Sequence, residues 1–238
     1  MEMKVVMKDP KKSDYFYEES IKTLRTNIQF LGKQTKIILF TSCYPNEGKS
    51  DVAFTLSVEM GKTGKRVLLI DADIRKSSYV RRFHVKEKVA GLSQYLSGQI
   101  DMGNIVYQTN YENMDMIFSG PTAPNPSELL NDPEFERLLK DKKEEYDYIF
   151  IDTPPALNLT DATVVARHCD GGILVVEAEA VSYKIAQKVK AQIERSGCPI
   201  LGAVLKLKWI SKKENIITPI MARGIIRNNL EGMVCNIG

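Results

Sequence analysis

The stretch Lys36–Ser50 reads KIILFTSCYPNEGKS, an apolar strand-like run followed by a loop that ends in Gly-Lys-Ser. A loop that leaves a buried strand and enters a helix presents backbone N–H groups to an anion, and the helix dipole favours negative charge there. Gly48 lets the main chain approach a phosphate closely. Lys49 can reach the β- and γ-phosphates, and the Ser50 hydroxyl can ligate Mg²⁺. The stretch therefore predicts a phosphate-binding loop within an α/β fold.

The loop departs from the usual GxxxxGK[ST] pattern, because Cys43 stands at the place of the first glycine. Asp51 is also unexpected: an acid in the first turn favours the helix, but it would weaken nucleotide binding if it faced the phosphates. We predict eight contiguous nucleotide-binding residues: Tyr44, Pro45, Asn46, Glu47, Gly48, Lys49, Ser50 and Asp51.

Two further apolar runs end in aspartate. Asp71 follows VLLI, with Asp73 two residues later, and Asp152 follows YIFI. The carboxyl ends of parallel strands border the crevice in which α/β sheets bind ligands. Three carboxylates beside a polyphosphate are electrostatically reasonable only with a divalent cation, which takes carboxylate and phosphate oxygens together. These acids therefore predict ATP and Mg²⁺ as the cofactors of the site.

Short β-branched or aromatic runs alternate along the chain with amphipathic stretches of helical length. This pattern predicts an α/β fold with a mostly parallel central sheet and helices on both faces. The predicted strands are Lys36–Thr41, Arg66–Ile70, Met114–Phe118, Tyr148–Ile151, Gly172–Val176 and Ile200–Leu205. The predicted helices are Ser50–Lys62, Asp132–Glu145 and Tyr183–Ser196. The prolines of Gly120–Ser127 predict a loop.

We divide the chain into an N-terminal arm with a helix (1–34), a P-loop domain (35–216) and a tail (217–238). Pro10 and the lysines around it indicate a loose arm. In Glu18–Leu31, apolar residues recur at three- and four-residue steps, which predicts a helix with one apolar face. That face packs on the core, on another subunit, or on both. The tail from Ile217 onward shows no clear period.

The composition is that of an ordinary globular chain, with 43% hydrophobic and 26% charged residues among 238. A net charge of +3 is too small to indicate nucleic acid, so we predict no such partner. From Lys184 onward there are ten Lys or Arg against three Glu. We interpret this bias as a solvated basic face, in preference to a surface for an anionic partner or membrane.

The four cysteines lack CxxC spacing, which favours reduced thiols in the cytoplasm. The N-terminus lacks the apolar core of a signal peptide, and no apolar run is long enough to cross a bilayer. Any membrane association is therefore expected to come through a partner or the surface of the protein.

Taken together, these residues resemble the bacterial tyrosine kinases (BY-kinases), which govern capsule and exopolysaccharide production and belong to the deviant P-loop ATPases. The resemblance runs from about Glu19 to Leu205. Its motifs are the loop Ser42–Ser50, IDADIRKS at Ile70–Ser77, GLSQYLSG at Gly91–Gly98, GPTAPNPSELL at Gly120–Leu130 and IDTPP at Ile151–Pro155.

The resemblance implies an ATP-dependent protein-tyrosine kinase. In that family the acid that corresponds to Asp71 is implicated in binding metal and in activating the tyrosine hydroxyl. The implied catalytic residues are Lys49, Asp71, Asp73 and Asp152, and the implied metal ligands are Ser50, Asp71 and Asp152. Physically this is phosphoryl transfer by positioning and charge neutralisation. Arg75 is interpreted either as a phosphate neighbour or as a surface salt-bridge partner.

The resemblance also implies partners. These are a membrane-embedded polysaccharide co-polymerase or modulator as activator, and proteins that carry the substrate tyrosines. The chain would then be cytoplasmic and peripheral to the inner face of the membrane. The assembly motif Glu-x-x-Arg-x-x-Arg is matched by Glu19, Lys22 and Arg25, which predicts a homo-oligomer. Lys22 replaces an arginine, and an ammonium cannot make the two parallel hydrogen bonds that a guanidinium makes to a carboxylate. Assembly is therefore expected to be weaker.

Two departures leave other functions open. The last tyrosine is Tyr183, so the C-terminal tyrosine cluster of the family is missing, and Lys206 and Lys208 follow GAVL where an Asn commonly contacts adenine in related ATPases. One alternative is a non-catalytic scaffold that binds nucleotide. The other is a partitioning-type ATPase switch, but that class needs a signature lysine where this chain has Tyr44. We favour the kinase, because the lysine and all the acids are present.

Overall fold

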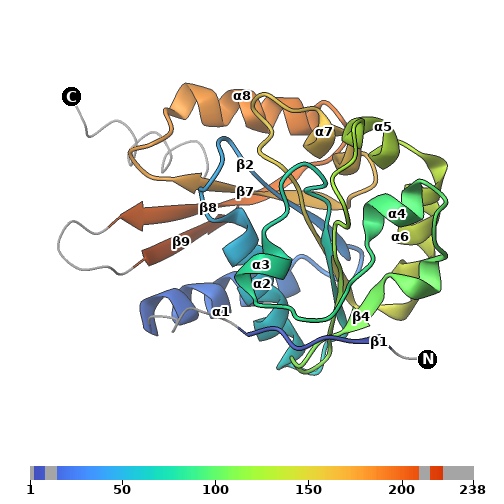
Figure 1. Ribbon diagram of the computed structural model, residues 1–238. Helices are drawn as coiled ribbons and strands as arrows, with labels where there is room; N and C mark the ends of the chain where they lie inside the picture. The colour runs from blue at the N-terminus through green and yellow to red at the C-terminus, as the bar shows by residue number, and fades with distance from the viewer. Residues whose placement is uncertain (1–2, 9–14, 209–214, 222–238) are drawn as a thin grey trace.

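The computed structural model describes residues 3–8, 15–208 and 215–221 (Figure 1). They form one nine-stranded sheet in the order β1-β4-β5-β3-β6-β2-β7-β8-β9. The strands are β1 (Met3–Lys4), β2 (Ile37–Ser42), β3 (Val67–Asp71), β4 (Val106–Gln108), β5 (Met114–Ile117), β6 (Tyr148–Asp152), β7 (Gly171–Glu177), β8 (Ile200–Lys208) and β9 (Asn215–Met221). Only the pairs β4–β5 and β8–β9 are antiparallel within this described sheet, which confirms the predicted mostly parallel arrangement.

Helices cover both faces of the sheet, α1 and α2 lying on one side and α7 and α8 on the other (Figure 1). The helices are α1 (Tyr15–Gln29), α2 (Lys49–Gly61), α3 (Tyr79–Arg82), α4 (Leu92–Leu96), α5 (Pro126–Leu130), α6 (Pro133–Glu145), α7 (Asp161–Ala166) and α8 (Tyr183–Glu194), with a 3₁₀ turn η1 at Met102–Asn104.

The two cores follow from the two-residue period of the strands. In β2, Ile37 and Leu39 join a core cluster that contains residues of α6 and α8. Ile38 and Phe40 point the other way and join a cluster with residues of α1 and α2. Because both faces are covered, the central strands are apolar except at their C-terminal ends, which is why they were recognisable in the sequence.

All six predicted strands and the predicted long helices are present, with shifted ends. The predicted loop Gly120–Ser127 is wrong in its last two residues, because α5 begins at Pro126. Proline suits the first turn of a helix, where its missing N–H would have no partner in any case.

The two ends of the chain contribute edge strands that the sequence analysis did not predict. In the N-terminal arm, β1 pairs in parallel with β4, and Val5 and Met7 are buried. The stretch around Pro10 lies outside the described residues. Helix α1 packs on the core through the one apolar face that the sequence predicted, formed by Ile21, Leu24 and Ile28. At the other end, β9 crosses the boundary that we placed after residue 216, and residues 222–238 lie outside the described part.

Two simpler expectations concern membranes and cysteines. In the described residues, no helix combines the length and apolarity that crossing a bilayer requires. Cys43, Cys169 and Cys198 carry free thiols, and Cys235 lies outside the described residues.

Candidate nucleotide-binding site

Three neighbouring parallel strands bring the candidate residues to one edge of the sheet. Strand β6 lies between β3 and β2, and Asp71 is the register partner of Asp152 across β3 and β6. On the other side, Phe40 of β2 is the register partner of Asp152, and the chain continues from β2 through the loop into α2. Parallel alignment therefore places both aspartates beside the start of α2.

The loop turns into α2 at Gly48, whose φ of 90° and ψ of 14° are left-handed. This conformation favours glycine strongly. Asn46 also has a positive φ, of 70°, and asparagine tolerates that region better than most residues. Cys43 is not among the residues with positive φ, so its backbone does not need the glycine of the usual pattern.

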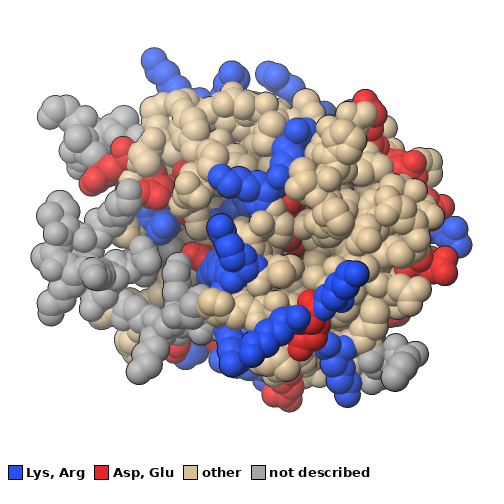
Figure 2. Space-filling view, in the orientation of Figure 1, with Lys and Arg blue, Asp and Glu red and all other residues tan. Residues whose placement is uncertain are grey.

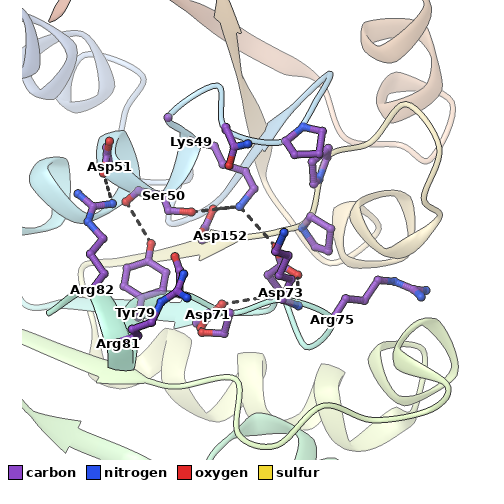
Figure 3. Close-up of a pocket in the computed structure, with 18 of the residues that line it drawn as sticks. Lys49, Ser50, Asp51, Asp71, Asp73, Arg75, Tyr79, Arg81, Arg82 and Asp152 are labelled. Atoms are coloured by element: carbon purple, nitrogen blue, oxygen red, sulfur yellow. Dashed lines mark hydrogen bonds and ion pairs between the residues drawn. The ribbon is translucent and has the colours of Figure 1, made fainter. Parts of the chain in front are cut away.

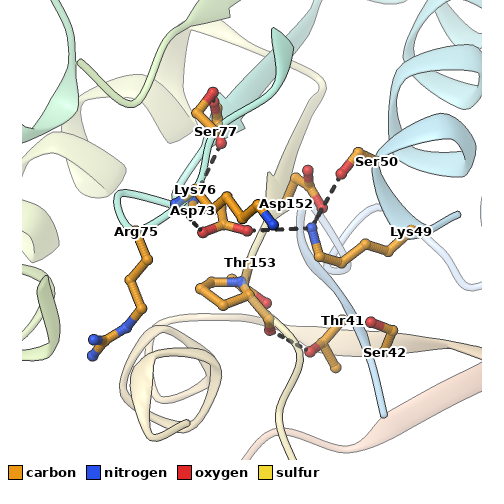
Figure 4. Close-up of polar contacts among 12 residues, drawn as sticks. Thr41, Ser42, Lys49, Ser50, Asp73, Arg75, Lys76, Ser77, Asp152 and Thr153 are labelled. Carbon is orange, nitrogen blue, oxygen red and sulfur yellow. Dashed lines mark hydrogen bonds and ion pairs between the residues drawn. The ribbon is translucent and has the colours of Figure 1, made fainter. Parts of the chain in front are cut away.

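Lys49 lies between two of the predicted carboxylates. Its Nζ is 3.2 Å from Asp152 Oδ1 and 3.7 Å from Asp73 Oδ2, and it donates to the Ser50 hydroxyl at 3.1 Å (Figures 3 and 4). Burial disfavours the ammonium charge, but Asp152 and Asp73 outweigh it and raise the pKa of Lys49. Lys49 is therefore a fixed, fully charged cation at the start of α2.

Asp71 is fully buried, and its surroundings disfavour its charged form. Burial, together with the nearby charge of Asp152, raises the pKa of Asp71 to about 7. Its carboxylate accepts hydrogen bonds from the Ser77 hydroxyl and, at 3.2 Å, from the backbone N–H of Asp73.

Asp152 supplies an observation that bears on a metal. Its Oδ2 atom is buried and has no hydrogen-bond partner in the described residues, a costly arrangement unless a ligand pairs with it. Among these residues, no group of three or more His, Cys, Asp or Glu is placed to hold a metal ion. Mg²⁺ at a nucleotide commonly takes only one or two carboxylates, together with phosphate oxygens and water. The donor set of Asp152, Asp71 and Ser50 fits that kind of binding.

These residues line a cleft of about 620 Å³, within the size range of small-molecule sites. Its wall includes Pro45, Asn46 and Gly48 of the loop, Lys49, Ser50 and Asp51 at the start of α2, and the aspartates Asp71, Asp73 and Asp152. It also includes the basic side chains Arg75, Lys76, Arg81, Arg82 and Lys206. Figure 2 shows Lys and Arg gathered near the middle of the face on which α3 lies in Figure 1.

Tyr44 and Glu47, which we predicted as nucleotide-binding residues, do not line the cleft. Tyr44 packs against a hydrophobic core. The Glu47 side chain is 3% exposed and turns into the protein. It accepts hydrogen bonds from the backbone N–H of Tyr44 at 2.6 Å and of Glu177 at 3.0 Å. Glu47 thus joins the loop to the end of β7.

The helix α3 contributes contacts that the sequence analysis missed. Arg82 forms an ion pair with Asp51, so the unexpected acid has a basic partner within the protein. The Tyr79 hydroxyl donates to the backbone oxygen of Ser50 at 3.1 Å. The IDADIRKS motif pointed to the preceding segment, but a four-residue helix leaves no periodic signal, so neither contact could be predicted.

Arg75 is a salt-bridge partner in this structure, which is the second of its two predicted roles. Its guanidinium binds both carboxylate oxygens of Asp161, at 2.6 and 2.9 Å, and the Ser127 hydroxyl at 3.2 Å. Burial alone would raise the pKa of Asp161, but the bonds from Arg75 and Ser127 outweigh it and lower that pKa. The pair joins the segment after β3 to α5 and α7.

A strand–loop–helix phosphate site with carboxylates on the neighbouring strands defines a P-loop nucleotide-binding protein. Residues 35–196 match the family model described as an AAA domain. Tyrosine-protein kinase CpsD of Streptococcus agalactiae is 40% identical over 188 residues, which are 79% of this chain and 81% of that protein.

Two solved structures extend the comparison. The kinase domain of the Escherichia coli tyrosine kinase ETK has a TM-score of 0.76 at 31% identity, over 82% of this chain and 78% of that one. The septum site-determining protein MinD of Pyrococcus horikoshii, complexed with Mg-ADP, has a TM-score of 0.63 at 25% identity, over 76% of this chain and 74% of that one. The chain belongs to the bacterial tyrosine kinase family of P-loop proteins.

Proposed function

We propose that this protein transfers the terminal phosphoryl group of ATP to tyrosine side chains of proteins and so regulates capsule or exopolysaccharide synthesis or export. The observation that carries the proposal is the position of Lys49, within 4 Å of Asp73 and Asp152 at the end of a phosphate-binding loop. Family membership supports the choice of tyrosine as acceptor, because CpsD is named as a tyrosine-protein kinase.

Each residue has a stated task in this proposal. The loop N–H groups and the Lys49 ammonium hold the phosphates. Ser50, Asp71 and Asp152 would hold Mg²⁺, which would supply positive charge against the phosphate oxygens. A tyrosine hydroxyl has a pKa of about 10 and needs a proton acceptor at neutral pH. Asp71 is that acceptor, and Asp73 keeps Lys49 oriented through their ion pair.

Labelled ATP, Mg²⁺, a tyrosine-containing protein and the cytoplasmic segment of the activator provide the test. We expect phosphotyrosine with the wild-type chain and none with Lys49→Met, because the phosphates lose their principal cation. Lys190→Met is the matched control: Lys190 pairs with Glu194 on α8 and does not line the cleft. Equal labelling by Lys49→Met and wild type would refute the assigned site.

A non-catalytic scaffold is the second candidate, because the sequence holds no tyrosine after Tyr183. Nucleotide binding without phosphotyrosine on any substrate would favour it. The partitioning-type switch has less support, since Tyr44 replaces its signature lysine and MinD is less similar than ETK in both sequence and structure. ATP hydrolysis stimulated by a membrane or DNA would favour that class.

The proposal extends to partners and location. We place the protein in the cytoplasm, at the inner face of the membrane, bound to a membrane-embedded polysaccharide co-polymerase that activates it. A homo-oligomer through Glu19, Lys22 and Arg25 remains part of the proposal. Glu19 and Lys22 pair with each other at 2.7 Å on the exposed side of α1, whereas Arg25 lies 3.5 Å from Glu59 of α2. Glu19→Ala should therefore weaken assembly, measured by light scattering, without a loss of stability.

A further inference from the structure

Lys206, near the C-terminal end of β8, lies across the phosphate-binding loop. A Cβ atom built on Gly48 would lie 3.4 Å from Lys206 Cδ and 3.8 Å from its Nζ. The aliphatic part of the lysine therefore lies within van der Waals range of a Cβ at position 48, beside the loop. The same side chain lines the cleft that holds Lys49 and the three aspartates.

The Lys206 ammonium is only loosely held by the protein. Its register partner on β7 is Glu177, whose Oε2 is 3.8 Å from Nζ. This distance is beyond a hydrogen bond. Glu177 is the one ion-pair partner that the described residues give Lys206. An ammonium has three N–H donors, so this group can bind an anion in the cleft.

The charges around the loop create a need for such a cation. Lys49 is already flanked by Asp73 and Asp152, Arg75 is bound to Asp161, and Arg82 to Asp51. These three cations thus have much of their charge offset by carboxylates. A polyphosphate on the loop brings several more negative charges, and an ammonium within reach forms strong charge-assisted hydrogen bonds with phosphate oxygens.

We propose that Lys206 is a second phosphate-binding lysine, which moves from Glu177 to a phosphate oxygen when nucleotide occupies the loop. This assignment rests on the proposed function to the extent that the cleft must bind a nucleoside triphosphate. A phosphate contact has a definite consequence for specificity. It strengthens binding of any nucleoside triphosphate by the same factor and gives no preference for the base.

Equilibrium titrations with MgATP and MgGTP test the assignment. Lys206→Met keeps the length of the side chain but removes the charge. We expect both nucleotides to bind about ten- to a hundredfold more weakly, the range for a charge-assisted hydrogen bond. Lys206→Arg keeps the charge and should retain most of the affinity. Lys190→Met, whose lysine pairs with Glu194 on α8, should bind like the wild type. Thermal melting confirms that each variant is folded.

Three results with the Lys206→Met variant would overturn the assignment. Unchanged affinity of a folded Lys206→Met would show that the lysine touches no phosphate. A loss confined to one nucleotide would indicate a contact with the base, and tighter binding would show that Lys206 blocks the cleft. If the wild type bound neither nucleotide, the proposed function would fail together with this assignment. If the wild type bound nucleotide and Lys206→Met bound it equally tightly, this assignment would fail while the proposed function would stand.

Discussion

Individual buried acids determine the properties of the site. Asp71, Asp152 and Glu47 are at most 3% exposed, although burying a carboxylate is costly. Asp152 is compensated by the Lys49 ammonium, whereas Glu47 is compensated by two backbone N–H groups. None of the described ion pairs includes Glu47. Burial therefore raises the pKa of Glu47, although the backbone hydrogen bonds act to lower it.

Glu47→Gln is expected to change how stability depends on pH. Because the pKa of Glu47 is higher in the folded than in the unfolded chain, the folded state binds more protons as pH rises past the ordinary glutamate pKa of about 4.3. Stability from this group is therefore greatest below that pH and falls until the folded-state pKa is passed. Glutamine does not ionise and removes this loss. The unfolding free energy of the variant should therefore increase relative to that of the wild type as pH rises. Urea titrations from pH 4 to 8 measure it.

Below its folded-state pKa the protonated carboxyl of Glu47 offers the N–H groups of Tyr44 and Glu177 one carbonyl oxygen, as the amide does. The difference between glutamine and the protonated carboxyl is therefore a constant offset that is separable from the slope. Glu144→Gln, on the exposed side of α6, is the control and should follow the wild-type curve. A Glu47→Gln curve parallel to wild type would contradict the raised pKa.

Among the helices and strands, those that could be predicted are the ones whose buried residues form a recognisable apolar pattern in a short stretch of sequence. Strands β2, β3 and β6 are apolar except at their C-terminal ends because both faces are covered, and the acids at the ends of β3 and β6 could be placed from parallel topology alone. Edge strands β1 and β9 gave no signal, since their pairing depends on distant segments. The contacts of Glu47 with Glu177, of Tyr79 with Ser50 and of Lys206 with the loop could not be predicted for the same reason: the completed sheet brings these groups together.

The end of helix α2 provides a prediction that opposes helix propensity. Alanine is about 1 kcal/mol better than glycine within a helix, so Gly61→Ala would ordinarily stabilise α2. A Cβ at Gly61 would, however, lie 2.2 Å from the backbone oxygen of Glu112. We expect the variant to lose about 1–3 kcal/mol, the usual cost of overpacking, in urea titrations. Gly103→Ala, with no atom within 4 Å of its Cβ, should stay within about 0.5 kcal/mol of wild type. A stabilised Gly61→Ala would mean that α2 does not approach Glu112 so closely.

For the whole molecule, the cleft and the fold depend on the same elements. The ends of β2, β3 and β6 and the start of α2 form the site, and these elements also contain the residues of both core clusters. A ligand that binds only the folded state therefore stabilises the entire sheet. Thermal unfolding then reports on the nucleotide and on the metal without any measurement of catalysis.

MgATP at a hundred times its dissociation constant should add about 2.7 kcal/mol to the unfolding free energy. In a chain of 238 residues, this corresponds to a rise of about 5–10 °C in the melting temperature. Removing Mg²⁺ with EDTA should abolish most of the rise, because Asp71 and Asp152 would then face the phosphates without a cation between them. Asp152→Asn should make the rise less sensitive to EDTA, since it removes both a metal ligand and a repelling charge. An equal rise with and without Mg²⁺ in the wild type would exclude these aspartates as metal ligands, while leaving the loop and Lys49 as the phosphate site.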